Sequence, residues 1–142
     1  MPDETIRYYP GGSIERREYR VDGKLHRLDG PAKITYYITG EVRTESYYVN
    51  GLRSRIDDPA CLGFSQKRTP TYIEFWIEGK RHKVEEPAST WYFPNGKIRR
   101  IEYWLSGKLH RADGPAIVFY NRDGTVRNQG YWLNGERQVT SL

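Results

Sequence analysis

The sequence lacks the features on which several protein classes depend. It has one cysteine, Cys61, among 142 residues, so no internal disulfide can brace the fold. No stretch approaches the roughly 18 apolar residues of a membrane-spanning helix. The opening residues MPDET carry no apolar run of the kind found in signal peptides, and no apolar periodicity predicts a helix. We therefore expect a soluble, intracellular protein that is not secreted.

Aromatic residues and glycines are abundant instead, and they recur in a fixed order. The 12 Tyr and 4 Trp exclude a disordered chain. Residues 23–32 read GKLHRLDGPA, and residues 107–116 repeat this string with one change. Weaker copies, GLRSRIDDPA and GKRHKVEEPA, begin at residues 51 and 79, so that every copy starts 28 residues after the last. A fixed period of this length indicates a repeat array.

We predict one repeat domain, residues 1–142, made of five copies of this 28-residue unit. The predicted repeats span residues 6–33, 34–61, 62–89, 90–117 and a truncated 118–142. The third copy departs most from the others, because its first turn lacks glycine and Pro70 replaces a Val or Ile. This departure indicates either drift in a tolerant loop or a specialised contact loop.

Each repeat contains two stretches with the alternation of a β-strand. Ile6 and Tyr8 represent the first stretch, and Tyr19 and Val21 the second, each pair on one strand face. Glycine turns, several of them Asn-Gly or Asp-Gly, separate the stretches. We therefore predict an all-β fold, an elongated antiparallel β-meander of about five hairpins. The apolar positions change parity at Ile14 and its equivalents, which predicts a β-bulge there.

The tandem Tyr-x-x-x-Gly and Glu-x-Tyr-x-x-Asn-Gly pattern resembles MORN repeats over about residues 6–138. The 28-residue period with a His-Arg-x-Asp-Gly-Pro-Ala loop is similar to MORN-variant proteins of large DNA viruses of the marseillevirus group. The resemblance implies an elongated, non-catalytic sheet that serves as a scaffold for protein partners, membrane lipid or self-assembly. Several arrays of this kind pair into dimers, so we expect a homodimer.

Histidines and charged pairs recur in the loop that follows the second strand. His26, His82 and His110 share one repeat position, where the second copy has Ser54. Equivalent residues of stacked hairpins lie roughly 10 Å apart, too far to share one metal ion, so each histidine is expected to bond backbone carbonyls or its own Asp. The expected structural ion pairs are Arg27/Asp29, Arg55/Asp57, Lys83/Glu85 and Arg111/Asp113. We expect no catalytic residue, no metal site and no cofactor.

Large aromatic side chains gather on the strand face opposite Tyr19 and Val21. They are Trp76, Trp91, Trp104, Phe119 and Trp132. In one interpretation the loops fold back over these rings, with Leu25, Leu109 and the column from Leu28 to Ala112 as a lid. In the other, the rings form an exposed track for a partner chain, stacked bases or lipid.

A basic edge and an open strand complete the candidate surfaces. The basic candidates are Arg16, Arg43, Lys67, Arg68, Arg99, Arg100 and Arg127. They favour phosphates of nucleic acid or anionic lipid, or else a solvated face, since glutamates are interleaved. The last strand has no successor, so Tyr131, Trp132 and Leu133 form the expected dimer edge.

The function that these patterns favour is a non-enzymatic platform for protein partners, acting in the host cell if the chain is viral. The net charge of +5 is compatible with the alternative, which is binding of nucleic acid or anionic lipid. An enzyme is least favoured, because no phosphate loop, metal motif or catalytic triad is present. A viral protein of this kind is expected in the host cytoplasm or nucleus, or in the virion.

Overall fold

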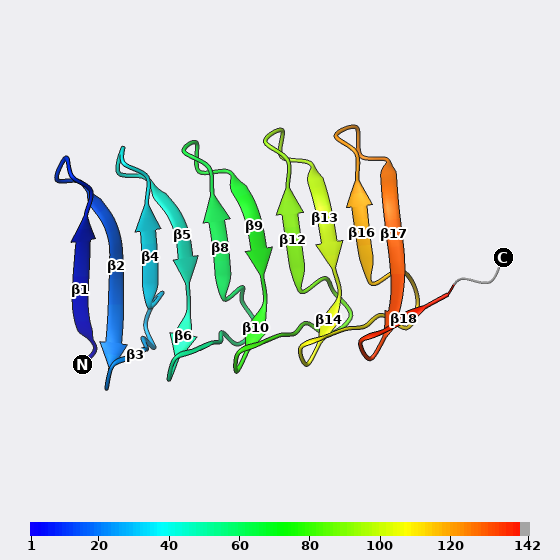
Figure 1. The fold of residues 1–142 in the computed structure, drawn as a ribbon, viewed down its shortest axis with the longest axis horizontal. Helices are drawn as coiled ribbons and strands as arrows, with labels where there is room; N and C mark the ends of the chain where they lie inside the picture. The colour runs from blue at the N-terminus through cyan, green and yellow to red at the C-terminus, as the bar shows by residue number, and fades with distance from the viewer. Residues whose placement is uncertain (140–142) are drawn as a thin grey trace.

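A computed structural model describes residues 1–139, and every regular element in that range is a β-strand. The main sheet runs in chain order through the following strands: β1 (Asp3–Tyr8), β2 (Ile14–Val21), β4 (Lys33–Tyr36), β5 (Val42–Ser46), β8 (Cys61–Phe64), β9 (Pro70–Glu74), β12 (Ser89–Tyr92), β13 (Ile98–Glu102), β16 (Ile117–Tyr120), β17 (Val126–Leu133) and β18 (Glu136–Gln138). All neighbours pair antiparallel, so the predicted all-β meander is confirmed. The hairpins stand in single file, from β1 at one end of the sheet to β17 and β18 at the other (Figure 1).

Short strands form a second row of small hairpins at one end of the main strands. They are β3 (Lys24–Leu25), β6 (Tyr48–Val49), β7 (Leu52–Arg53), β10 (Trp76–Ile77), β11 (Lys80–Arg81), β14 (Trp104–Leu105) and β15 (Lys108–Leu109). The strands β4, β8, β12 and β16 begin 28 residues apart, at the period read in the sequence. Of the fifth predicted repeat, residues 140–142 lie outside the described residues.

The predicted β-bulge is present in every long hairpin. In the first one, Arg7 pairs with Arg16, but the next residue, Tyr8, pairs with Ile14, so Glu15 is left over. The same shift recurs between β4 and β5, β8 and β9, β12 and β13, and β16 and β17. The extra residue shifts the alternation of side chains by one position, which explains why the apolar residues Ile14 and Tyr19 are out of phase in the sequence.

Within residues 1–139 no second layer of strands or helices covers the sheet. The described residues with no exposure at all are the alanines that end the loops: Ala32, Ala60, Ala88 and Ala116. The accessible surface is 9333 Å², against about 7,600 Å² expected for a compact chain of this mass. Stability therefore comes from contacts between neighbouring repeats and from no central core.

A repeated set of three hydrogen bonds, the repeat clasp, joins each loop to the next small hairpin. In the first clasp the Gly51 N–H donates to the Leu25 carbonyl (2.8 Å), and the Arg27 N–H donates to the Tyr48 carbonyl (3.2 Å). Between them the Asn50 N–H donates to His26 Nδ1 (3.0 Å). The same three bonds recur at the other interfaces, through residues 53–55 with 76–79, 81–83 with 104–107, and 109–111 with 132–135.

The histidine column therefore behaves differently from its prediction. The Nδ1 atom of each ring accepts a hydrogen bond from a backbone N–H of the next repeat. The prediction of bonds to backbone carbonyls or to the histidine's own Asp is therefore wrong. An accepting Nδ1 is unprotonated, so the proton of the neutral ring lies on Nε2. Ser54 performs the same task, because its Oγ accepts from the Glu78 N–H at 3.1 Å. The column is thus a structural link between repeats.

Substitution at His26 tests the clasp. We expect His26→Ser to retain stability to within about 0.5 kcal/mol, because serine already serves at residue 54, and His26→Ala to lose about 1 kcal/mol. Urea unfolding of the two variants measures the difference. Equal stability of the serine and alanine variants would show that the bond to Asn50 contributes nothing.

The first turn of the third repeat contains a strained residue. Gly12, Gly40, Gly96 and Gly124 all have positive φ at this position, and Arg68 takes their place with φ 64°. A side chain in this left-handed region costs free energy that glycine avoids. The first turn of the third repeat therefore keeps the positive φ of the other turns, and this costs free energy because Arg68 stands in place of glycine.

We expect Arg68→Gly to stabilise the protein by about 0.5–1 kcal/mol. Lys67→Gly is the matched control, since residue 67 has no positive φ, and it should destabilise through greater unfolded-state freedom. Thermal unfolding compares the two. A lower melting temperature for Arg68→Gly than for the parent would contradict the strain.

Candidate functional site

The two faces of the sheet differ in chemistry. One face carries the column Tyr19, Tyr47, Phe75 and Tyr103 and the loops that follow the small hairpins, and we call it the loop face. The other carries Tyr48, Trp76 and Trp104 with interleaved arginines, and we call it the ladder face. Strand alternation and the cross-strand register assign residues to the two faces.

On the loop face, a cation of each loop lies over the aromatic ring of its own repeat. The guanidinium carbons of Arg27, Arg55 and Arg111 are 4.0 Å from the ring centroids of Tyr19, Tyr47 and Tyr103, and Lys83 Nζ is 4.4 Å from that of Phe75. The loops therefore cover this column and not the tryptophan face. The part of the predicted lid formed by the column from Leu28 to Ala112 is wrong, since Leu28, Ile56 and Val84 are 81%, 76% and 61% exposed. Leu109 does lie opposite Trp104 in the β14–β15 pair.

The loop ion pairs follow the prediction in two repeats and depart from it in two. Arg27 pairs with Asp29 at 3.0 Å and Arg111 with Asp113 at 3.1 Å. Arg55 instead pairs with Asp58 at 3.4 Å, so the pair predicted with Asp57 is wrong. A glycine follows Asp29 and Asp113, whereas Asp57 itself takes positive φ (64°). The loop then presents the carboxylate one residue later.

The third loop shows the same departure. Lys83 pairs with Glu86 at 3.5 Å, and the predicted partner Glu85 has φ 62°. Both exceptions lack the glycine that Gly30 and Gly114 supply in the first and fourth loops. The pair predicted between Lys83 and Glu85 is therefore also wrong.

On the ladder face, arginines and aromatic rings alternate along the array. Arg53 lies 5.8 Å from the Tyr48 ring and 5.2 Å from the Trp76 ring, and Arg81 lies 5.1 Å from Trp76 and 5.2 Å from Trp104. Glu74 stabilises this arrangement, because its carboxylate accepts hydrogen bonds from Trp76 Nε1 (2.9 Å) and from Arg81 (3.2 Å). Arg53 and Arg81 belong to successive repeats, so the Trp76 ring is contacted by a cation from each of two repeats.

A second aromatic row lies beside this ladder. Tyr72 stacks on Trp91 with centroids 4.7 Å apart, and Arg100 lies over Trp91 and Phe119 at 5.1 and 6.0 Å. A Cβ at Gly63 would come within 2.3 Å of the Tyr72 ring, so this glycine makes room for it. The five predicted aromatic residues thus share one face and are half-buried, while guanidinium groups occupy faces of several rings.

The predicted basic edge separates into two groups. Arg16 and Arg100 lie on the ladder face, paired with Glu18 (2.9 Å) and Glu102 (2.8 Å). Arg43, Arg99 and Arg127 occupy the exposed bulge position, and Lys67 and Arg68 lie in the β8–β9 turn. The bulge residues still reach the ladder-face rings, since the Arg127 guanidinium lies 5.8 Å from the centroid of the Phe119 ring.

The expected dimer edge is also corrected. Tyr131, Trp132 and Leu133 pair with Gln138, Arg137 and Glu136, so this part of β17 has a neighbour in β18. Within residues 1–139, the unpaired outer edge of β17 is its earlier part, residues 126–130.

No described group suggests a metal centre or a membrane crossing. Among residues 1–139 no three His, Cys, Asp or Glu side chains are arranged to hold a metal ion. The same range contains no helix with the length and apolar character needed to cross a bilayer.

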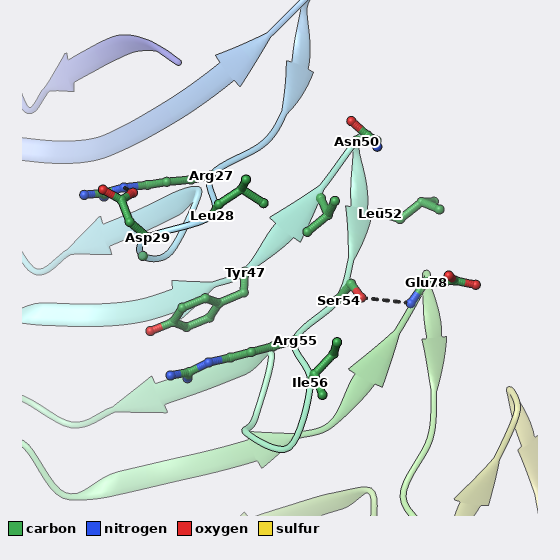
Figure 2. A pocket seen from close by; sticks show the side chains of 12 residues that line it. Arg27, Leu28, Asp29, Tyr47, Asn50, Leu52, Ser54, Arg55, Ile56 and Glu78 are labelled. Carbon is green, nitrogen blue, oxygen red and sulfur yellow. Dashed lines mark hydrogen bonds and ion pairs between the residues drawn. The ribbon is translucent and has the colours of Figure 1, made fainter. Parts of the chain in front are cut away.

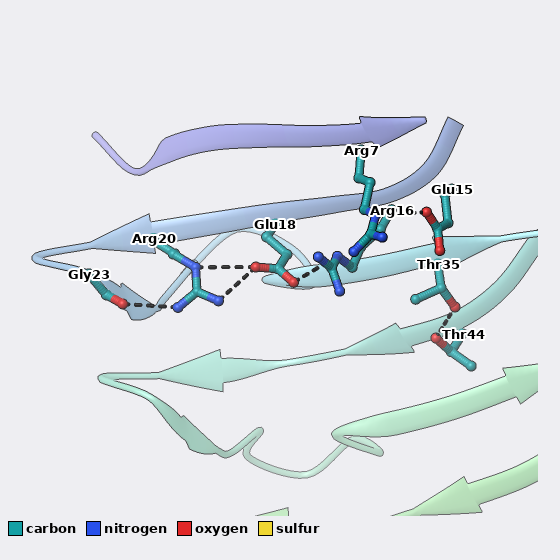
Figure 3. A network of polar contacts seen from close by, with 8 residues as sticks. All are labelled: Arg7, Glu15, Arg16, Glu18, Arg20, Gly23, Thr35 and Thr44. Atoms are coloured by element: carbon teal, nitrogen blue, oxygen red, sulfur yellow. Dashed lines mark hydrogen bonds and ion pairs between the residues drawn. The ribbon is translucent and has the colours of Figure 1, made fainter. Parts of the chain in front are cut away.

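Sequence reasoning missed the carboxylates beneath the ladder. Glu18, Glu74 and Glu102 are buried and occupy one repeat position, where the second repeat has Ser46. The sequence signal that could have revealed these carboxylates is this repeat position, which reads Glu, Ser, Glu and Glu in the first four repeats. Burial opposes the charge of Glu18, but the hydrogen bond from Arg20 and the charges of Arg16 and Arg20 hold its pKa below the ordinary value (Figure 3).

Comparison of the chain with models of known families, with curated proteins and with solved structures finds no match. The class that the fold defines is a single-layer antiparallel repeat sheet.

Acid unfolding tests the Glu18 network. A carboxyl whose folded pKa lies below the ordinary value of 4.5 stabilises the fold above that pH, and this stability is lost as the pH falls through the folded pKa. We therefore expect Glu18→Gln to be less stable at neutral pH and to lose less stability on acidification. Urea midpoints between about pH 7 and pH 3 measure this. Glu136→Gln, at an exposed site, is the control, and the same pH dependence in both variants would contradict the assignment.

Proposed function

We propose that the chain is a non-enzymatic, MORN-like repeat protein that serves as a binding platform for a protein partner. The observation that carries this proposal is the exposed aliphatic row on the loop face: Leu28, Ile56 and Val84, one residue per repeat. Exposed apolar side chains at a regular spacing on a rigid sheet are typical of an interaction surface. The viral origin, the host compartment and the homodimer stay predictions of the resemblance.

A groove between the first two loops offers a place for apolar side chains. It encloses about 820 Å³, with Leu28, Leu52 and Ile56 around it and Tyr47 on its floor (Figure 2). Its two arginines are already engaged, since Arg55 lies over Tyr47 and pairs with Asp58, and Arg27 pairs with Asp29. The groove is therefore nearly neutral, which favours a protein partner over a phosphate polymer.

The spacing of the repeats supports a more specific partner. Two strands occupy about 9.6 Å along the sheet, and a polyproline II segment advances about 9.3 Å in three residues. A partner segment in that conformation, with an apolar side chain at every third residue, would place successive side chains beside successive loops.

Substitution in the groove tests the platform. We expect Ile56→Asp to weaken capture of the partner from native cell extract at least tenfold, because a carboxylate would enter an apolar contact. Binding by the parent should persist as salt rises, since the contact is apolar. Ile38→Asp is the matched control, an exposed aliphatic residue in a turn away from the groove. Undiminished capture by Ile56→Asp, or loss of parental binding in salt, would overturn the proposal.

The ladder face supports a second candidate, binding of nucleic acid or an anionic lipid surface. Its arginines are numerous, and its carboxylates Glu18, Glu74 and Glu102 are buried beneath them. Bases have little access to the faces of Trp76, so the contacts would run from guanidinium edges to phosphates.

A labelled single-stranded oligonucleotide tests this second candidate. Affinity should fall steeply between about 50 and 200 mM salt, and Arg53→Gln should weaken binding at both. Absence of binding at the lower salt concentration would remove this candidate.

A further inference from the structure

The second repeat lacks a carboxylate that the other complete repeats place beneath the ladder. Glu18 pairs with Arg16 and Arg20, Glu74 accepts from Trp76 and Arg81, and Glu102 accepts from Trp104. In the second repeat this position is Ser46, which is also buried. Its hydroxyl brings no negative charge to the basic groups around it.

The basic residues that would pair with such a carboxylate are nevertheless present. Arg53 is the repeat equivalent of Arg81, and its Nε donates to the Tyr48 hydroxyl (3.1 Å). Lys33 lies directly opposite Ser46 in the β4–β5 pair. Among residues 1–139, neither of them has a carboxylate at ion-pair distance, and the same holds for Arg43.

A hollow of about 360 Å³ opens at this place on the ladder face. Its charged lining consists of four cations and one carboxylate: Arg16, Lys33, Arg43, Arg53 and Glu15. Hydroxyl groups make up much of the remaining lining: Thr35, Thr44, Ser46, Tyr9, Tyr36, Tyr48 and Tyr72. The space exists because the cross-strand row that begins at Arg16 passes through two small residues, Thr35 and Thr44.

The acidic groups near the hollow are already engaged. Glu15 pairs with Arg7 at 3.1 Å, and Glu18 holds Arg16 and Arg20 (Figure 3). Glu74 is bonded to Trp76 and Arg81. Burial raises the pKa of the Cys61 thiol beside Ser46, so this group adds no negative charge at neutral pH. Glu18 lies opposite Lys33 across the β2–β4 pair, and the charge of Glu74 acts on Arg53. Both carboxylates make their close contacts with other groups, so Lys33, Arg43 and Arg53 keep open positions for a further anion.

We propose that this hollow binds a phosphate monoester group, which takes the place of the carboxylate that Ser46 lacks. Phosphate suits the lining better than a carboxylate, because it carries up to two charges and three terminal oxygens for several donors. The hollow accommodates the phosphate with part of the group that it esterifies. This inference does not depend on the protein-platform proposal, and it meets the second candidate function only in the phosphate group, since it concerns a small anion at one repeat.

The decisive variant supplies the missing charge from within the chain. We expect Ser46→Glu to reproduce the arrangement of Glu74 and Arg81 in the next repeat, to fold, and to lose phosphate binding. Gln66→Glu adds the same charge in an exposed turn and should bind as the parent does. Lys33→Gln removes one donor with no added carboxylate, and it keeps the test valid if Ser46→Glu fails to fold.

Isothermal titration with glycerol 3-phosphate measures the free ester, and flotation with phosphatidylcholine vesicles, with or without phosphatidic acid, measures the lipid-borne group. We expect the parent to bind at least one phosphate probe, and Ser46→Glu and Lys33→Gln to bind at least tenfold more weakly, about 1.4 kcal/mol. Binding of the free ester alone identifies a soluble ligand, and tighter binding to the phosphatidic acid vesicles identifies a headgroup. No binding to either probe, or parental binding by folded Ser46→Glu, would overturn the proposal.

Discussion

The repeat clasp is the constraint on which the rest of the structure depends. A single-layer sheet has no core to orient its parts, so each hairpin must be fixed by the one before it. The Asn50 N–H on His26 and the flanking backbone bonds supply this link. Because the link recurs at the same spacing, the sheet grows by addition of equal units.

Cations lie over aromatic rings on both faces of the sheet, but they link different parts of the chain. On the loop face each cation covers a ring of its own repeat and pairs with an acid of its own loop, as Arg27 does with Tyr19 and Asp29. On the ladder face Arg81 bridges the rings of two repeats. The loop face is therefore close to electrical balance and leaves aliphatic side chains outermost, whereas the ladder face keeps its arginines above buried carboxylates.

Exceptions within a repeat column carry the most information about this protein. Ser54 shows that a hydroxyl can replace the histidine of the clasp, and Arg68 shows that the turn keeps its φ without glycine. Ser46 leaves basic groups without their acid. The 28-residue pattern describes what the copies share, while these departures distinguish one repeat from another.

The 28-residue period, the strand alternation and the glycine turns determined the meander and its bulges by themselves, because these patterns act over a few residues. The sequence also placed the five large aromatic side chains on one face. The tertiary structure alone decided which face the loops cover, that Asp58 and not Asp57 meets Arg55, and that β18 pairs with Tyr131 to Leu133. Those outcomes depend on the path of the loops in space and on contacts between repeats, and spacing along a chain specifies neither.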